Sequence, residues 1–188
     1  MCRLTPGLCA CGVLPRIDLP VEVLVVQHHK ERHSQSNTGA LTHRLLARSR
    51  LLRFAPRSAP FDATPLLQPG TVVLWPERGE PLAPGRAPAR IVVLDATWRQ
   101  ARRMSTRIEG LRRMPFATLP PTAPRWVLRE PPAPGRLSTV EAIACAIECL
   151  GFHEQAAAMY GALDLVMSRL VRLRCKPHPD GRAPTRSG

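Results

Sequence analysis

The residues best suited to chemistry in this sequence are one acid and a series of arginines that follow it. Asp95 comes directly after the apolar run 91–94, and Arg99, Arg103 and Arg107 recur every four residues beyond it. A carboxylate beside a cavity can accept or orient a proton, and guanidinium groups bind phosphate well. We interpret the stretch as an acid site next to an anion-binding face. A helix cap at Asp95 and a solvated helix face for the arginines are the structural alternatives.

The pattern around Asp95 also predicts the elements that position it. The apolar, mostly β-branched run 91–94 is typical of a strand buried on both faces of a parallel sheet, and Thr97 is suited to cap the next helix. Ligands bind at the carboxyl ends of such strands, where strand ends and helix starts meet. Further strands are expected at 21–27, 51–55, 71–75, 116–119 and 126–129, and helices at about 38–48, 97–111, 138–150 and 153–173. The Gly/Pro-rich segment 77–88 is expected to be a loop. The sequence therefore predicts an α/β fold with a mostly parallel sheet and flanking helices.

Several motifs, taken together and in order, resemble the DTW-domain family. Asp95-Ala96-Thr97-Trp98, followed by Gln100, Ala101 and Met104, matches the motif that gives the family its name. The other matching groups are Cys9-x-Cys11-Gly12-x-Leu14-Pro15, Asn37-Thr38-Gly39 after His28 and Glu31, and Ser138-Thr139-x-Glu141-Ala142. They cover nearly the whole chain up to about residue 151. The resemblance implies a SPOUT-like fold and leaves open whether a C-terminal knot forms.

The resemblance also implies an activity. Members of this family resemble tRNA-uridine aminocarboxypropyltransferases, which move the 3-amino-3-carboxypropyl group of S-adenosylmethionine (SAM) onto the imide nitrogen of a uridine and release methylthioadenosine. Asp95, Thr97 and Trp98 would then be catalytic, with Asp95 accepting the imide proton or orienting the uridine. The residues that would contact SAM are Asn37, Thr38, Gly39, Ser138, Thr139 and Glu141. The arginines at 99, 103 and 107 would hold tRNA phosphates.

Structural interpretations of the same residues stay open. Ser138 and Glu141 have the spacing of a capping box, and the turn 37–39 also suits an ordinary helix start. Trp98 would serve equally well as a core residue or as a surface on which an unpaired base stacks. The sequence alone does not decide between these roles.

A cluster of cysteines near the start suggests a metal. Cys2, Cys9 and Cys11 can fill most of a tetrahedral zinc shell. The family pattern has four cysteines, with a Cys-x-x-Cys pair ahead of the Cys-x-Cys, whereas one cysteine precedes Cys9 here. Zinc ligands and ordinary reduced thiols therefore both remain open. Disulfides are not expected in a cytosolic protein.

Charge and composition narrow the class of partner. The 188 residues carry a net charge of +13, which favours binding to a polyanion such as RNA. A run of about 18 apolar residues and a signal-peptide core are both absent, so a cytoplasmic location without membrane contact is expected. The predicted parts are a Cys-rich segment at 1–15, a catalytic domain at 16–174 and a disordered tail at 175–188. Monomer and homodimer stay open.

Three other functions compete with the aminocarboxypropyltransferase. A SPOUT-type RNA methyltransferase would use the same fold and SAM, and a transferase directed at rRNA would differ only in its RNA. A non-catalytic, zinc-pinned RNA-binding module would need neither Asp95 nor SAM. The absence of GxGxxG, GxSxG and HExxH motifs argues against dinucleotide binding, serine hydrolysis and zinc proteolysis.

Overall fold

The protein is described by a computed structural model, which covers residues 9–33, 38–55, 60–125 and 137–174. Within these residues six strands form one sheet in the order β2-β1-β5-β3-β6-β4, and every neighbouring pair is parallel. The strands are β1 (Glu22–His28), β2 (Ser49–Phe54), β3 (Thr71–Leu74), β4 (Glu80–Pro81), β5 (Arg90–Asp95) and β6 (Phe116–Thr118). The helices are α1 (Thr38–Leu45), α2 (Trp98–Arg107), α3 (Thr139–Cys149) and α4 (His153–Arg174), with short 3-10 helices η2 (His29–His33) and η3 (Leu111–Arg113). The predicted α/β fold is confirmed.

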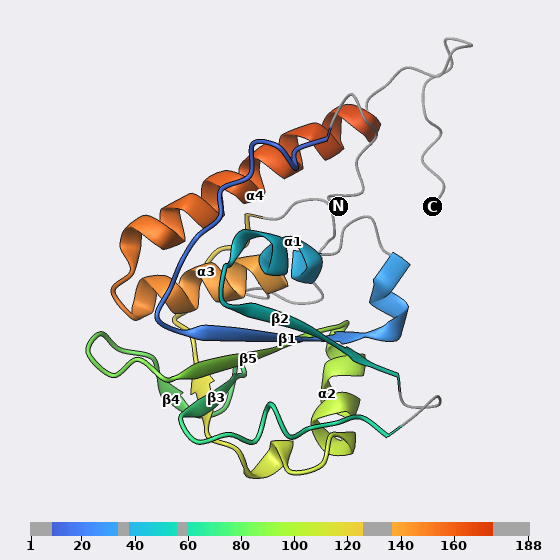
Figure 1. Ribbon diagram of the computed structural model, residues 1–188, viewed down its shortest axis with the longest axis vertical. Coiled ribbons are helices and arrows are strands. Elements are labelled where there is room, and N and C mark those ends of the chain that lie inside the picture. Colours follow the sequence, from blue (N-terminus) through green and yellow to red (C-terminus); the bar gives the residue numbers. More distant parts are fainter. Residues whose placement is uncertain (1–8, 34–37, 56–59, 126–136, 175–188) are drawn as a thin grey trace.

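Helices cover both faces of the sheet. Figure 1 shows α1, α3 and α4 on one side and α2 on the other. On the first side Val25 and Ile91 pack into one apolar core, and on the α2 side Val26, Val92 and Met104 belong to another. Because β1 and β5 are buried on both faces, their sequences read as continuous apolar runs.

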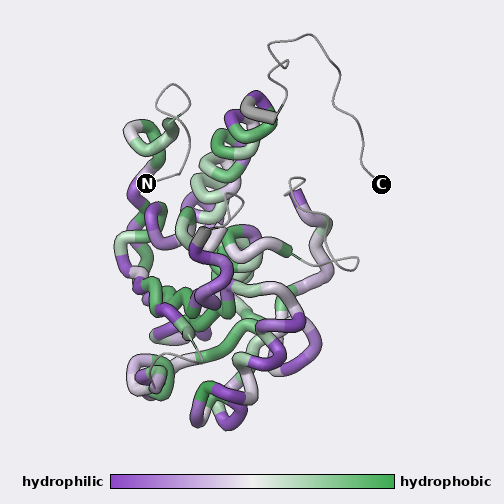
Figure 2. The backbone as a smooth tube through the Cα atoms, turned by 90° about the vertical axis from the view of Figure 1, so that its right-hand side faces the viewer, coloured by the Kyte–Doolittle hydropathy of each residue, from purple (hydrophilic) through white to green (hydrophobic). Residues whose placement is uncertain are grey.

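The last two helices form a hairpin whose inner faces complete the larger core. Gly151 joins α3 to α4 with φ of 91°, a conformation in which glycine is favoured because it has no Cβ. Ile147 of α3 and Leu163 of α4 are buried where the helices meet the rest of that core. Figure 2 shows hydrophilic and hydrophobic residues alternating along α4, as expected for a helix with one covered face.

The segment 77–88 differs from its prediction as a plain loop, because it contains the edge strand β4. Glu80 and Pro81 pair with Ala117 and Thr118 of β6. Gly79 has φ of 106° and lies so close to the Phe116 backbone that a Cβ there would overlap its carbonyl group. A two-residue strand made of an acid and a proline has no apolar pattern to reveal it.

Several predictions fall on residues that the structure does not describe. They are the strand at 126–129 and the disordered tail at 175–188. The knot also stays a prediction, because part of the connection from β6 to α3 is outside the described residues. Among the helices that are described, none combines the length and apolar character that a membrane span requires.

Candidate active site at the carboxyl edge of the sheet

Asp95 ends β5 and is held in a fixed orientation. The residue is only 5% exposed to solvent. Oδ2 accepts a hydrogen bond from Gln27 Nε2 at 3.0 Å, and Oδ1 accepts one from Thr139 Oγ1 at 2.8 Å. Gln27 is the residue of β1 that pairs in register with Asp95. Because a buried carboxylate is costly without donors, these two contacts define its orientation.

The first turn of α1 packs directly against the same carboxyl group. A Cβ built on Gly39 would overlap Cγ and Oδ2 of Asp95 and would lie 2.9 Å from Oδ1. Thr38, which begins the helix, is also buried. Asp95 therefore lies between the starts of α1 and α3. Asn37, the third residue of the predicted turn, is outside the described residues.

Helix α2 starts just beyond Asp95, as the sequence predicted. Thr97 caps it: Thr97 Oγ1 accepts the Gln100 N–H at 3.4 Å, and Gln100 Oε1 accepts the Thr97 N–H at 2.8 Å. The side of α2 that faces the sheet is buried at Ala101 and Met104. The predicted arginines at 99, 103 and 107 are exposed. The helix thus presents a guanidinium surface to solvent.

A cavity of about 360 Å³ lies at the carboxyl end of β5, where Leu94 and Ala96, the chain neighbours of Asp95, are part of its lining. Its walls are mainly apolar and come from the ends of β3 and β5, the starts of α2 and α3, and the segment 119–121. The lining residues are Leu74, Trp75, Pro76, Glu77, Val93, Leu94, Ala96, Trp98, Ala101, Leu119, Pro120, Pro121, Leu137, Thr139 and Ala142. The rings of Trp75 and Trp98 meet edge to face, with centroids 6.1 Å apart. Thr139 is the wall residue that also contacts the Asp95 carboxylate.

The start of α3 forms part of the cavity wall and contacts Asp95 through Thr139. Ser138 is the N-cap residue, and its N–H donates to Glu141 Oε2 at 2.8 Å. Glu141 is 1% exposed, and its other oxygen accepts the backbone N–H of Arg125. Of the three residues predicted in this helix, Thr139 therefore reaches the cavity, while Glu141 holds backbone groups next to it.

The other half of the carboxyl edge, formed by β1 and β2, is basic. Arg53 of β2 pairs in register with Gln27, and Lys30 and Arg32 follow on η2; all three are exposed. His28 is buried between His29 and Phe54, with its Nδ1 accepting the Lys30 N–H at 3.3 Å. Burial lowers the pKa of His28 below its ordinary value of 6.5, and the neighbouring His29 and Lys30 charges lower it further.

The whole arrangement has a counterpart among known proteins. The sequence model of the DTW domain matches residues 1–173, which is most of the chain. This protein belongs to the DTW-domain family. The family resemblance predicted from the motifs is therefore confirmed.

Two known proteins are similar to this DTW-domain chain over most of its length. A tRNA-uridine aminocarboxypropyltransferase A from Arabidopsis thaliana is 28% identical over 217 residues, covering 93% of this chain and 80% of the plant protein. The structure of the SAM-dependent rRNA:acp-transferase Tsr3 from Vulcanisaeta distributa superposes with a TM-score of 0.55 at 19% identity. That comparison covers 82% of this chain and 79% of Tsr3. The second similarity establishes a shared fold.

The three letters of the DTW motif have different positions in the structure. Asp95 is the buried acid, Thr97 is the helix cap, and Trp98 is part of the cavity wall. Gln27, Trp75 and the segment 119–121 were not predicted from the sequence to be part of the site. Gln27 had a usable signal, because it is a polar side chain just before the end of a mostly apolar strand. The others are brought in from distant parts of the chain and carry no local pattern.

The cysteine segment of the DTW domain is held against the helices. Arg169 of α4 donates to the carbonyl of Cys9, and Arg44 of α1 donates to the carbonyl of Cys11 at 2.7 Å. In the described part of the chain, no three His, Cys, Asp or Glu side chains lie close enough together to hold a metal ion. Cys2 is outside that part. Zinc binding by Cys2, Cys9 and Cys11 therefore stays a prediction.

Proposed function

We propose that the protein transfers the 3-amino-3-carboxypropyl group of SAM to the imide nitrogen of a uridine in tRNA. The observation that carries this proposal is the position of Thr139, whose side chain joins an apolar cavity to the buried carboxylate of Asp95. The 28% identity to a plant tRNA-uridine aminocarboxypropyltransferase supports the reaction and the choice of tRNA.

The cavity suits the adenosine part of SAM. Its volume of about 360 Å³ falls within the range of small-molecule sites, and its apolar wall includes Trp75 and Trp98. Thr139 and the backbone near Leu137 would contact the bound SAM. Gly39 and Glu141 do not line the cavity and would instead hold in place the residues that do. SAM supplies an electrophilic carbon next to its sulfonium, so the protein has to orient that carbon and the uridine.

Asp95 would act on the uridine through Thr139. The Thr139 hydroxyl donates its proton to Asp95, which leaves the oxygen lone pairs to accept a proton from a group in the cavity. The imide proton of uridine would pass to the Thr139 oxygen while the Thr139 proton passes to Asp95. The freed electron pair on nitrogen forms the new C–N bond, the C–S bond breaks, and methylthioadenosine leaves. Thr97 fixes the start of α2, and Trp98 shapes the wall beside the base.

RNA would reach the site over the basic surface around the carboxyl edge. Arg99, Arg103 and Arg107 would hold phosphates along α2, and Lys30 and Arg53 add positive charge on the β1/β2 side of the edge. The target uridine has to be unpaired or drawn out of its stack, because base pairing in a duplex engages the imide group.

A product analysis tests the proposal directly. The protein is incubated with SAM and unmodified tRNA, or in parallel with rRNA, and the nucleosides are then identified by mass spectrometry after digestion. An aminocarboxypropyl uridine from tRNA is the expected product. A methylated base would identify a methyltransferase, modified rRNA alone would move the substrate to the ribosome, and RNA binding without SAM binding would indicate a non-catalytic module.

A zinc ion at the cysteine segment is a separate part of the proposal. It would hold residues 1–15 together through thiolates, in a segment too short to bury its own core. Metal analysis of the purified protein and of the Cys9→Ala variant would test it. Stoichiometric zinc that is lost in the variant is the expected result, and a metal-free protein would leave these residues as thiols.

A further inference from the structure

Glu141 makes an unusual pair of contacts for a residue in the first turn of a helix. One carboxylate oxygen accepts the N–H of Ser138, at the start of its own helix, and the other accepts the N–H of Arg125, which lies before the undescribed segment 126–136. The residue is 1% exposed, so both contacts are shielded from water. A capping box accounts for the first contact and leaves the second unexplained.

The two backbone groups held by Glu141 adjoin two chain segments that both line the cavity. Leu119, Pro120 and Pro121, shortly before Arg125, form one wall. Leu137 and Thr139, on either side of Ser138, form another part of the lining. A single carboxylate therefore links two chain segments that line the cavity.

The wall before Arg125 is also fastened to the helices by side chains. The Arg125 guanidinium lies over the ring of Tyr160 at 4.3 Å and within 3.9 Å of the Asp164 carboxylate on α4. Thr122 Oγ1 is 3.6 Å from Cys145 Sγ on α3. These contacts fix the segment 122–125 on α3 and α4, and Glu141 is the residue that links it to the start of α3.

We infer that Glu141 is a positioning residue that links the backbone at Arg125 to the backbone at Ser138 and so sets the spacing of the cavity walls next to them. The inference deepens the proposed function and rests on it for the identity of the ligand. A carboxylate is needed because it offers an acceptor to each backbone N–H. A glutamine offers one acceptor and turns a donor toward the second N–H, and an aspartate is one methylene too short to reach both.

The test compares Glu141→Gln and Glu141→Asp with a control, Glu22→Gln. Glu22 is a partly buried carboxylate that accepts from Arg90 Nε at the amino end of β1 and does not line the cavity. Two quantities are measured: hydrogen exchange of the Arg125 and Ser138 amides by NMR, and the affinity for S-adenosylhomocysteine by calorimetry. Steady-state KM values for SAM and for tRNA complete the set.

The link made by Glu141 between Arg125 and Ser138, here called the clamp, predicts a specific pattern in these measurements. Both Glu141 variants should exchange at least one of the two amides faster and bind the probe about tenfold more weakly, since a buried donor loses its partner. KM for SAM should rise while KM for tRNA stays unchanged, and Glu22→Gln should match the wild type in all of these. If Glu141 only stabilised the fold, its variants would have a lower unfolding temperature, but KM for SAM would not rise separately from KM for tRNA.

The opposite results are equally clear. Unchanged exchange at both amides would show that Glu141 does not hold the backbone at Arg125 and Ser138. Faster exchange with unchanged affinity would show that this link does not set the spacing of the cavity walls. If Glu141→Asp behaved as wild type, the charge at the start of α3 would matter instead of the two contacts. Failure of the wild-type protein to bind the probe would count against the proposed function, and amide exchange would still decide whether the clamp exists.

Discussion

Gly39 and Asp95 are packed so closely that no other residue type fits at position 39 without a shift. The space that a Cβ would occupy on α1 is filled by the carboxyl group at the end of β5. Gly39 also belongs to the Asn-Thr-Gly turn that the sequence marked for SAM binding. In the structure its contribution is to let the acid fit between two helix starts.

Replacing Gly39 by alanine should therefore lower both stability and activity. The added methyl group has to displace Asp95 or the start of α1, which costs about 1–3 kcal/mol in the free energy of unfolding. Displacement of Asp95 would also lower kcat. Urea unfolding and a tRNA modification assay measure the two effects.

Gly161 provides the control for that substitution. It lies in α4, where an added Cβ would meet nothing within 4 Å. Alanine there should raise the free energy of unfolding by about 0.5–1 kcal/mol, because alanine loses less conformational freedom in a helix. Equal destabilisation by the two substitutions would contradict the packing argument.

The proposed route for the proton predicts that Thr139 and Asp95 act as one unit. Thr139→Val and Asp95→Asn should each lower kcat by about 100-fold or more, and the double variant should be little worse than either single variant. Rates measured under single-turnover conditions would show this. Thr42→Val, which removes a buried hydroxyl that bonds to Thr38 in α1, is the control. Multiplicative losses would mean that the two residues act independently.

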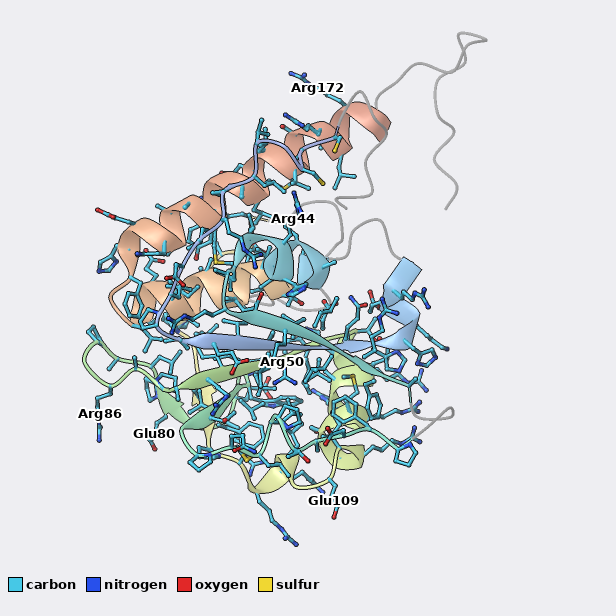
Figure 3. All side chains as sticks on the ribbon, viewed as in Figure 1. Arg44, Arg50, Glu80, Arg86, Glu109 and Arg172 are labelled. Atoms are coloured by element: carbon cyan, nitrogen blue, oxygen red, sulfur yellow. The ribbon has the colours of Figure 1, made fainter. Side chains whose placement is uncertain are left out.

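The arginines of α2 should contribute to RNA binding through charge. Arg99→Ala combined with Arg103→Ala should raise KM for tRNA and reduce the slope of log affinity against log salt by about 1 to 2, since each phosphate contact contributes about 0.7–0.9. The charge-matched control is Arg86→Ala with Arg172→Ala, which Figure 3 places far from the carboxyl edge. The same slope in both double variants would move the RNA to another surface.

His28 should make stability depend on pH. Its pKa in the folded protein lies below 6.5, so between that lower pKa and 6.5 the unfolded chain binds more protons than the folded one. The free energy of unfolding should therefore decrease as the pH falls from about 7.5 through 6.5 toward the lower pKa. His28→Gln should lessen the decrease, whereas His153→Gln at the exposed start of α4 should not. Urea unfolding across this pH range measures the difference.

The sequence predicted those parts of the fold that local patterns encode. The apolar runs at β1, β3 and β5 identified the buried strands, and Thr97 identified the start of α2. The two-residue strand β4 could not be predicted, because pairing with β6 defines it and its own residues do not.

The candidate site was predictable only in part for the same reason. Asp95 was recognised because it ends a buried strand next to a helix cap. Its contacts with Gln27 and Gly39 depend on how β1 and α1 pack beside β5, which no local pattern reports. The cavity itself is formed by four separate chain segments, among which the sequence had marked only the stretch from the end of β5 into α2 and the start of α3.

The two outer strands of the sheet restrict how copies of this chain can associate. At one end β4 presents two residues, of which Pro81 has no N–H to donate, and at the other end β2 carries the exposed side chains of Arg50 and Arg53. Edge-to-edge extension of the sheet into a continuous ribbon is thereby disfavoured. For the described part of the sheet, association through the helical faces is therefore favoured over pairing of its two strand edges.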